Sequence, residues 1–482
     1  MEGTSGAQIN KKTFIQSVLI LLAMMIIAGI LTKALPAGVY DRYEADGRIL
    51  IDQTSFRAIE RPDYPIWRWF TAPLEVLWGE DNLILITIIL FIVLVSGAFA
   101  VLEKSGIITS VLAKIVKRFS AQRYLLLLLI SLFFMLLGGF FGILEEIIPL
   151  VPLMIALSYS LGWDVLVGLG MSILATNIGF SAAVTNPFTI GVAQKLAGLP
   201  LFSGALFRIP VFIVFYGVLV WFLVTYARRI DRNPQSSLVY NEDKTRPTQY
   251  KQLDLNAHSS NPKMGRAALV FGLFMLLIIL LLVAGPFLPL ISEYALPLVG
   301  VLFFVGGVTS GKVSGAGWRR IGAALKEGIL GLAPGIPLIL MAASTKHIVS
   351  SGKVIDTILH SSSTLLQNTT PLSAVYVIFL LALMVEFFVA SAGAKAVLMM
   401  PILLPLADLV GVTRQLTVSA YSFGDGFTNL AYPTNAVLLI CLGLASISYG
   451  KWMRFTAKLW LVILPLVALF LWVGSLIGFG PF

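Results

Sequence analysis

Charged side chains within long apolar stretches are the residues of this sequence best suited to chemistry. They are Glu145, Glu146, Glu386, Lys395 and Asp425. A charge within a membrane is costly, so it is usually retained because it binds an ion, a proton or a substrate. The alternative is a structural ion pair or a position near the membrane surface. Lys395 is the single cation of this set, and an acid-rich site favours Na⁺, H⁺ or the amino group of an amino acid.

Two polar interruptions of the apolar sequence carry the same Thr-Asn pair beside a proline. Residues 175–187 end with Thr185-Asn186-Pro187, and residues 423–435 end with Pro433-Thr434-Asn435. Each interruption is predicted to be a helix that unwinds and restarts. Unwound carbonyls and Asn or Thr side chains can replace the hydration shell of a cation, and the amides that begin the new helix suit a carboxylate.

The candidate site residues fall into two groups. The residues assigned to substrate binding are Asn177, Thr185, Asn186, Ser391, Lys395, Asn429, Thr434 and Asn435. The residues assigned to a coupling cation are Glu145, Glu146, Asp425 and Thr428. Gly424 and Gly426 are predicted to leave the backbone around Asp425 unwound and its carboxylate unpaired, so that it takes a proton or holds a cation.

The composition places these residues in a membrane protein. Of the 482 residues, 58% are hydrophobic and 12% are charged, and the mean hydropathy is +0.91. A soluble domain has roughly 45–50% apolar and about 25% charged residues. We therefore predict an all-α polytopic membrane protein. The sequence has no P-loop, H-E-x-x-H or G-x-S-x-G motif, three histidines without metal-ligand spacing and one cysteine, so we expect no catalytic residues, no cofactor and no metal beyond Na⁺.

Nine segments are long and apolar enough to be clear membrane spans. They are Phe14–Ala34, Asn82–Leu102, Tyr124–Gly142, Phe207–Ala227, Ala267–Leu290, Tyr294–Thr309, Gly328–Ser344, Ala374–Val389 and Leu459–Gly478. Lys and Arg concentrate in cytoplasmic loops. Residues 37–81 carry five Arg and nine acidic residues and are placed outside, whereas the basic segments 104–123, 228–266 and 312–326 are placed inside. The N-terminus is therefore predicted to be cytoplasmic, and the net charge of +10 needs no nucleic acid to explain it.

The two halves of the chain resemble each other at a shift of 249 residues. Pro152 then aligns with Pro401, and Thr185-Asn186 with Thr434-Asn435, while the flanking segments exchange sides. We predict two inverted repeats. The ranges are residues 1–227, with a re-entrant hairpin near 124–162 and an unwound helix near 165–200; a cytoplasmic linker, 228–266; and residues 267–482, with a hairpin near 373–411 and an unwound helix near 415–448.

The repeat also predicts contacts between the halves. Glu146 aligns with Lys395, so an ion pair between these residues is expected where the hairpin tips meet. The unwound segments 176–187 and 425–435 are expected to face each other. Asn186 and Asn435 are then related by the pseudo-two-fold axis. Residue 368 is expected on the outer side.

Several motifs resemble the YfcC family of the anaerobic C4-dicarboxylate carrier group. They are residues 394–403 (AKAVLMMPIL), 405–408 (PLAD), 411–415 (GVTRQ) and 423–429 (FGDGFTN), with Glu145-Glu146 and Asn186-Pro187-Phe188. The resemblance runs over nearly the whole chain. This group is similar to the ion transporter superfamily, which implies a homodimer. It also implies a transport domain of hairpins and unwound helices that moves against a scaffold domain by an elevator movement.

The residues and the resemblance together predict a secondary active transporter in the bacterial cytoplasmic membrane. Its substrate is expected to be a small carboxylate-bearing metabolite. The acid-rich site favours an amino acid, and a C4-dicarboxylate is the alternative. Because no P-loop is present, an ion gradient or an exchange is expected to supply the energy, with Na⁺ or H⁺ as the coupling ion. A channel or an intramembrane enzyme fits less well, because inverted repeats are typical of secondary transporters.

Overall fold

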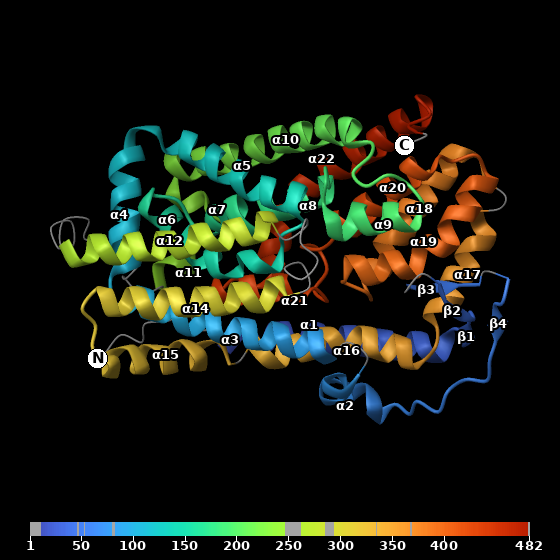
Figure 1. Cartoon of the computed structure of the whole chain (residues 1–482), viewed down its shortest axis with the longest axis horizontal. Helices are drawn as coiled ribbons and strands as arrows, with labels where there is room; N and C mark the ends of the chain where they lie inside the picture. Colours follow the sequence, from blue (N-terminus) through green and yellow to red (C-terminus); the bar gives the residue numbers. More distant parts are fainter. Residues whose placement is uncertain are drawn as a thin grey trace.

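The computed structural model shows a mostly helical protein (Figure 1). It describes residues 11–45, 48–52, 54–79, 82–245, 262–284, 294–333, 335–366 and 369–480. The α-helices are α1 (Lys11–Ala34), α2 (Trp67–Glu75), α3 (Asn82–Lys104), α4 (Ile107–Phe119), α5 (Arg123–Phe141), α6 (Val151–Ser160), α7 (Val165–Leu169), α8 (Ala175–Ala182), α9 (Val192–Leu196), α10 (Ala205–Arg232), α11 (Tyr240–Thr245), α12 (Pro262–Ala284), α14 (Ala295–Val313), α15 (Trp318–Leu332), α16 (Gly335–Ser351), α17 (Ile355–Leu366), α18 (Pro371–Glu386), α19 (Ala392–Leu409), α20 (Arg414–Phe427), α21 (Ala436–Leu444) and α22 (Tyr449–Leu476). The short strands are β1 (Gly38–Val39), β2 (Arg42–Ala45), β3 (Arg48–Ile51) and β4 (Arg57–Ala58). Among the described residues, ten helical segments are long and apolar enough to cross a membrane.

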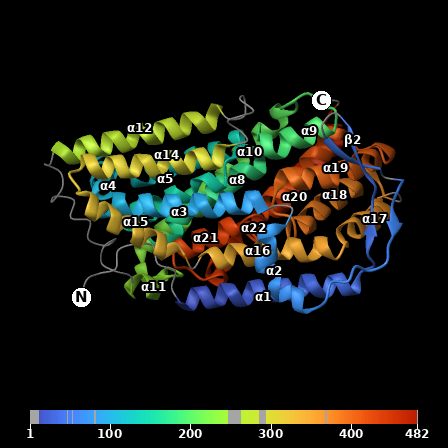
Figure 2. The same ribbon diagram turned by 60° about the horizontal axis from the view of Figure 1, so that its bottom comes forward.

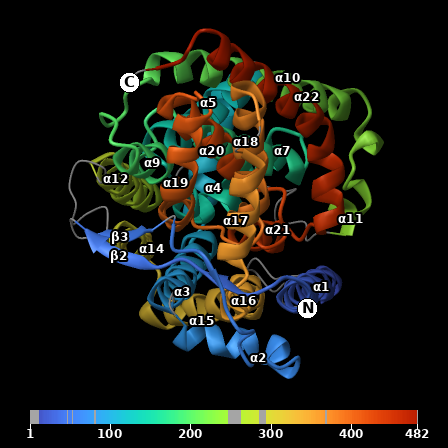
Figure 3. The same cartoon turned by 90° about the vertical axis from the view of Figure 1, so that its right-hand side faces the viewer.

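The helices lie in two layers. Helices α1, α3, α14, α15 and α16 form the lower layer of Figure 1, and α5, α8, α10, α18, α20 and α22 lie above them. The same division is visible from the end of the molecule (Figure 3). In the lower layer α3 packs against α14 and α15, and α1 packs against α16. In the upper layer the two halves of the chain meet, because α8 of the first half contacts α20 of the second.

The loops gather at two opposite ends of the molecule. Helices α4 and α11 lie toward one end, and the four strands and α17 lie at the other (Figures 1 and 2). The strands form two antiparallel pairs, β1 with β4 and β2 with β3. They are held to α17 by the ion pair Arg42–Asp356 at 2.7 Å and by Phe56 stacked on His360. Segments with opposite predicted sidedness thus lie at opposite ends, while the end that faces the cytoplasm stays a prediction. Residue 368 lies outside the described residues.

One predicted loop is largely helical. The basic segment 312–326, expected to be an inside loop, contains most of α15, and the predicted span Gly328–Ser344 straddles the end of α15 and the start of α16. Arg319 and Arg320 gave this segment the composition of a loop. Helix α15 is nevertheless amphipathic, and its buried Ile321 packs with α3.

Two helices of the upper layer are broken. In the first, α7 and α8 are joined by π-helical residues 170–174, and the helix stops at Ala183, whose φ of 45° is left-handed. The chain restarts as a π-helix at Pro187. The second broken helix is α20, which ends at Phe427 and restarts as α21. The non-helical segments are therefore residues 183–186 and 428–435, which are shorter than predicted.

Asn177 and Asp425 consequently lie on helices, in α8 and α20. The prediction that glycines unwind the backbone around Asp425 is wrong, and close packing explains them instead. A Cβ atom at Gly424 would lie 2.5 Å from the carbonyl oxygen of Phe379 in α18, and one at Gly426 would lie 2.5 Å from the Cα of Ser181 in α8. These glycines let three helices meet beside Asp425.

Candidate functional site

Three charged side chains of the second half form a buried cluster. Lys395 Nζ lies 2.6 Å from Asp425 Oδ1 and also forms an ion pair with Glu386 Oε2. The side-chain exposures are 1% for Glu386, 0% for Lys395 and 1% for Asp425. We call these three residues the buried charge cluster. The prediction that Asp425 is unpaired is therefore wrong.

The second predicted hairpin brings the cluster together. Glu386 is the last residue of α18, and Lys395 lies in the first turn of α19, so the intervening turn places them face to face. Helix α20 adds Asp425 from the side, and these three helices lie together in Figure 3. The Tyr421 hydroxyl, one turn before Asp425, donates a 2.5 Å hydrogen bond to the carbonyl of Ala392 and ties α20 to the start of α19.

The cluster is not balanced in charge. Two ionised carboxylates and one ammonium carry a net charge of −1, which is expensive when all three groups are removed from solvent. Asp425 Oδ2 has no hydrogen-bond partner among the described residues. Buried polar atoms are nearly always satisfied. The cluster is therefore suited to bind one further positive charge.

The tip of the first predicted hairpin contributes two more carboxylates. Helix α5 ends at Gly142, whose φ of 69° is left-handed, and Glu145 and Glu146 begin the next helical turn. Both side chains are half-buried, and Glu146 Oε2 accepts a hydrogen bond from the Leu144 N–H at 3.2 Å. The expected ion pair between Glu146 and Lys395 is not formed, because Lys395 is held by its two neighbours in the second half.

At the first hairpin tip, the interaction with the buried charge cluster is electrostatic and between like charges. Glu145 lies within electrostatic range of Asp425. A like charge near the cluster increases its need for a cation. The sequence repeat predicted an ion pair between Glu146 and Lys395, whereas the residue of the first hairpin tip that interacts with the cluster is Glu145, through Asp425.

Asn186 and Asn435 occupy equivalent places at the two helix breaks. Asn186 Oδ1 accepts hydrogen bonds from the N–H groups of Phe188 and Thr189 at 2.9 and 3.3 Å. Asn435 Oδ1 accepts the same bonds from the second and third residues after it, at 3.0 and 3.4 Å. Both residues are helix N-caps. The backbone N–H groups that were predicted to bind a substrate carboxylate therefore already donate to these two side chains.

The remaining amides bridge the breaks or stay unpartnered. Asn435 Nδ2 donates a 3.1 Å hydrogen bond to Asn429 Oδ1, so these two predicted site residues span the second break. Asn177 is fully buried on α8, and neither of its amide atoms has a hydrogen-bond partner among the described residues. An unsatisfied buried amide costs about 1–3 kcal/mol. Asn177 therefore marks a place where a ligand would be stabilised.

Among the hydroxyl residues of the predicted site, some donate hydrogen bonds to backbone carbonyls and one has no partner among the described residues. Thr185 N–H and Oγ1 donate to the carbonyls of Gly139 and Phe140, at 3.1 and 3.0 Å, and tie the first break to α5. Thr428 donates to its own helix, and Thr434 Oγ1 is buried without a partner among the described residues. Ser391 is exposed and caps α19, so the structure does not bring it into the buried charge cluster.

Two residues at the site were missed or left unassigned by the sequence analysis. Glu386 was recognised as a charge in an apolar stretch but was given no role. Arg208 is fully buried and donates hydrogen bonds to the carbonyls of Val184, at 3.2 and 3.1 Å, and Ser203, at 2.8 Å. It braces the first break, as Trp452 braces the second through a 2.8 Å bond to Leu430. The sequence did contain one indication of Arg208, because it is a single arginine within the predicted span Phe207–Ala227.

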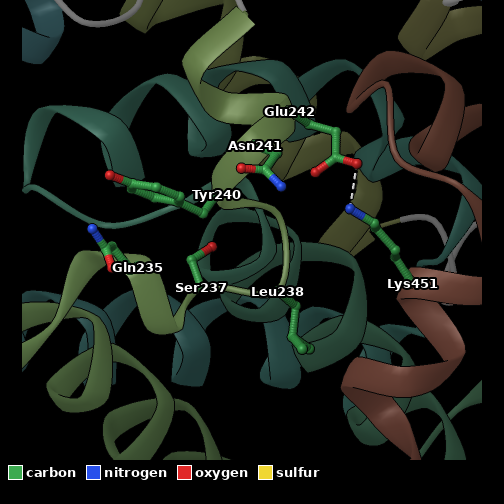
Figure 4. A pocket seen from close by; sticks show the side chains of 7 residues that line it. All are labelled: Gln235, Ser237, Leu238, Tyr240, Asn241, Glu242 and Lys451. Carbon is green, nitrogen blue, oxygen red and sulfur yellow. Dashed lines mark hydrogen bonds and ion pairs between the residues drawn. The ribbon is translucent and has the colours of Figure 1, made fainter.

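A separate polar pocket lies beside the linker (Figure 4). Its volume is about 410 Å³, and it is lined by Gln235, Ser237, Leu238, Tyr240, Asn241, Glu242 and Lys451. Glu242 and Lys451 form an ion pair across it. The linker is anchored by Asp164, which accepts 2.7 Å hydrogen bonds from Tyr226 and Ser237. The pocket contains none of the predicted site residues.

Within the described ranges, no group of three or more His, Cys, Asp or Glu side chains could hold a metal ion. In the buried charge cluster, the ammonium of Lys395 already lies between the two carboxylates.

Comparisons with known proteins give one family over nearly the whole chain. The family described as C4-dicarboxylate anaerobic carrier, DcuC, matches residues 14–475. "Putative basic amino acid antiporter YfcC" of Escherichia coli K12 is 28% identical over 480 residues, which cover 92% of each chain. An uncharacterized protein of Haemophilus influenzae is 26% identical over 413 residues, covering 83% of this chain and 76% of that protein.

Two solved structures are similar at lower identity. The Alcanivorax borkumensis YdaH transporter is 16% identical, with a TM-score of 0.43 and coverage of 97% of this chain and 98% of that one. Neisseria gonorrhoeae MtrF, described within a class of antimetabolite efflux pumps, is 17% identical, with a TM-score of 0.42 and coverage of 94% and 92%.

Proposed function

Because this chain belongs to the C4-dicarboxylate anaerobic carrier family and is therefore a membrane transporter and not an enzyme, we propose that it moves a small carboxylate-bearing metabolite by ion-coupled secondary transport. The first candidate substrate is an amino acid. The observation that carries the proposal is the buried charge cluster Glu386–Lys395–Asp425, with its net charge of −1 and no exposure to solvent.

Charge balance explains how this cluster couples an ion to a substrate. One bound cation neutralises the cluster. Lys395 can then contact a substrate carboxylate, and the site as a whole holds less negative charge than it would without the cation. The substrate in turn makes the cation more favourable, because linkage between two ligands is reciprocal. The two ligands therefore bind together, which is the basis of symport.

Other polar groups of the two helix breaks and of the first hairpin tip support a carboxylate-bearing substrate with an amino group. In this proposal Lys395 and the unpartnered amide of Asn177 contact the substrate carboxylate. Thr434, which belongs to the second break, has a buried hydroxyl without a partner among the described residues. Glu145 and Glu146 at the other hairpin tip contact the amino group. A basic amino acid, the class in the name of the Escherichia coli relative, is included in this class.

A C4-dicarboxylate is the second candidate, and the family description favours it. A dianion needs a second cation. Besides Lys395, Arg208 is the other fully buried basic side chain among the described residues, and its Nη1 has no hydrogen-bond partner there. Arg208 is therefore the residue to which the second carboxylate is assigned.

For the movement we propose an elevator in a homodimer of the bacterial cytoplasmic membrane, with the N-terminus in the cytoplasm. Both broken helices and both hairpins belong to the upper layer, whereas the lower layer consists of helices without such breaks in their described parts. We assign transport to the upper layer and the scaffold to the lower layer.

A ligand screen tests the substrate class. Purified protein is heated with amino acids or C4-dicarboxylates, each with and without Na⁺, and the unfolding temperature is recorded. We expect an amino acid to raise this temperature in wild type but not in Lys395→Met, while the exposed-lysine control Lys195→Met behaves as wild type. Stabilisation by dicarboxylates alone selects the second candidate. Stabilisation that survives Lys395→Met contradicts the assigned contact.

A further inference from the structure

We infer that the coupling ion is a proton, and that Glu386 and Asp425 bind it together on either side of Lys395. The coupling role rests on the proposed transport function, whereas the binding of the proton does not. Glu386, which the sequence analysis left without a role, is thereby a member of the ion site.

The ammonium of Lys395 occupies the position between the two carboxylates and forms ion pairs with both. A hard metal cation requires several oxygen ligands at once. A proton adds the same positive charge and does not need several oxygen ligands.

The charge count calls for one proton. Two carboxylates and one ammonium leave an excess of one negative charge, and a buried excess charge is strongly unfavourable. Asp425 Oδ2 has no hydrogen-bond partner within the described part of the chain, so it is open to protonation. Because the carboxylates share one ammonium, the proton belongs to the pair and not to either residue alone.

The charged groups around the cluster make the binding of one proton more favourable. The titratable groups that face Asp425 are Glu386 of α18, Lys395 of α19, Tyr421 of α20 and Glu145 of the first hairpin tip. Helix α8 contributes no charge. The other charged residues on the packed helices are exposed or paired elsewhere: Lys195, Arg454, Lys458, Asp408 with Arg414, and Lys451 with Glu242. Among the described residues outside the cluster, Glu145 is a further charge that interacts electrostatically with Asp425, and it is negative.

Infrared spectroscopy of the purified full-length protein tests the proton directly. A protonated carboxylic acid has a C=O stretching band that an ionised carboxylate lacks. We expect this band in wild type at neutral pH and a weaker band in Glu386→Gln and in Asp425→Asn, because either variant leaves a balanced ion pair that holds no proton. Asp408→Asn, which removes an exposed carboxylate of α19, should keep the band.

Removing the lysine gives the opposite result. In Lys395→Met, two buried carboxylates have no ammonium, so each should take a proton and the band should grow about twofold, as the preference of buried carboxyls for the neutral form requires. A purely structural ion pair predicts the same band intensity in wild type, Glu386→Gln and Asp425→Asn. Each variant is compared only after it elutes as a single species in size-exclusion chromatography.

The unfolding temperature in NaCl or choline chloride of equal ionic strength separates a proton from Na⁺. We expect the same value in both salts. Specific stabilisation by Na⁺ that is lost in Asp425→Asn, or the absence of the infrared band in wild type, would overturn the inference. The band without any gradient-driven transport would instead leave proton binding intact and remove the proposed function.

Discussion

Asn186 and Asn435 each close a break in a helix by capping the segment that follows. Asn435→Ala removes hydrogen bonds to two backbone N–H groups, and loss of such a cap costs about 1 kcal/mol. We therefore expect a lower unfolding temperature as well as reduced transport, with the same result for Asn186→Ala. Asn435→Ser keeps an oxygen for the cap and should recover most of the stability. Wild-type stability in both alanine variants would show that the caps contribute nothing.

The pairing of single residues was the least predictable feature of the site. The sequence showed that Lys395 and Asp425 are charges in apolar surroundings, but the alignment of the repeats suggested Glu146 as the partner of Lys395. The actual partners are Glu386, across the turn between α18 and α19, and Asp425 of α20. Repeat alignment carries no information about such contacts within one half. Arg208 was missed because its hydrogen bonds go to backbone carbonyls, which leave no pattern in the sequence.

Helices α5 and α8 show how small residues set the distance between elements. A Cβ atom at Gly138 would lie 2.0 Å from the carbonyl oxygen of Thr176, and one at Gly179 would lie 1.9 Å from that of Met135. Gly138→Ala should therefore separate the helices and destabilise the protein by about 1–3 kcal/mol. Gly217→Ala is the control, because Gly217 of α10 has no atom within 4 Å of its Cβ position among its described surroundings. Equal unfolding temperatures for the two variants would contradict this packing.

The contact of α2 with α16 provides a pH-dependent element outside the membrane spans. Burial tends to raise the pKa of Glu75, but hydrogen bonds with Arg68, Thr71 and His347 outweigh it and lower the pKa to about 2. A lowered pKa stabilises the fold fully above the ordinary value of 4.5, and this contribution is lost as the pH falls from there toward about 2. Glu75→Gln should be less stable than wild type at neutral pH, and the difference should shrink on acidification. The exposed Glu60→Gln should show no such difference, and a gap that widens at low pH would contradict the assignment.

Helices and helix breaks were predicted correctly where the local sequence alone determines them. Both helix breaks fall beside the Thr-Asn pairs, because Pro187 and the polar residues interrupt an apolar helix. The glycines beside Asp425 were misinterpreted, since glycine permits both unwinding and close packing, and only the neighbouring helices decide between them. The four short strands were not expected, because each is only two to four residues long.

At the scale of the whole molecule, the inverted topology can be tested with single cysteines. The native Cys441 is buried and free, so background labelling should be low. In intact cells, Asn368→Cys should react with an impermeant thiol reagent, and Gln235→Cys in the linker should react only after the membrane is opened. Labelling of position 368 only from the cytoplasm would overturn the inverted topology of the two halves.

Gradient-driven accumulation in proteoliposomes tests the central claim most directly. The probe is the amino acid or dicarboxylate that stabilises the purified protein, supplied in Na⁺-free buffer with a proton gradient directed inward. We expect wild type to concentrate it and Asp425→Asn to lose at least about tenfold of that accumulation, because the variant cannot link substrate to a proton, while substrate exchange persists. Accumulation that requires Na⁺, or that continues unchanged in Asp425→Asn, would contradict the account.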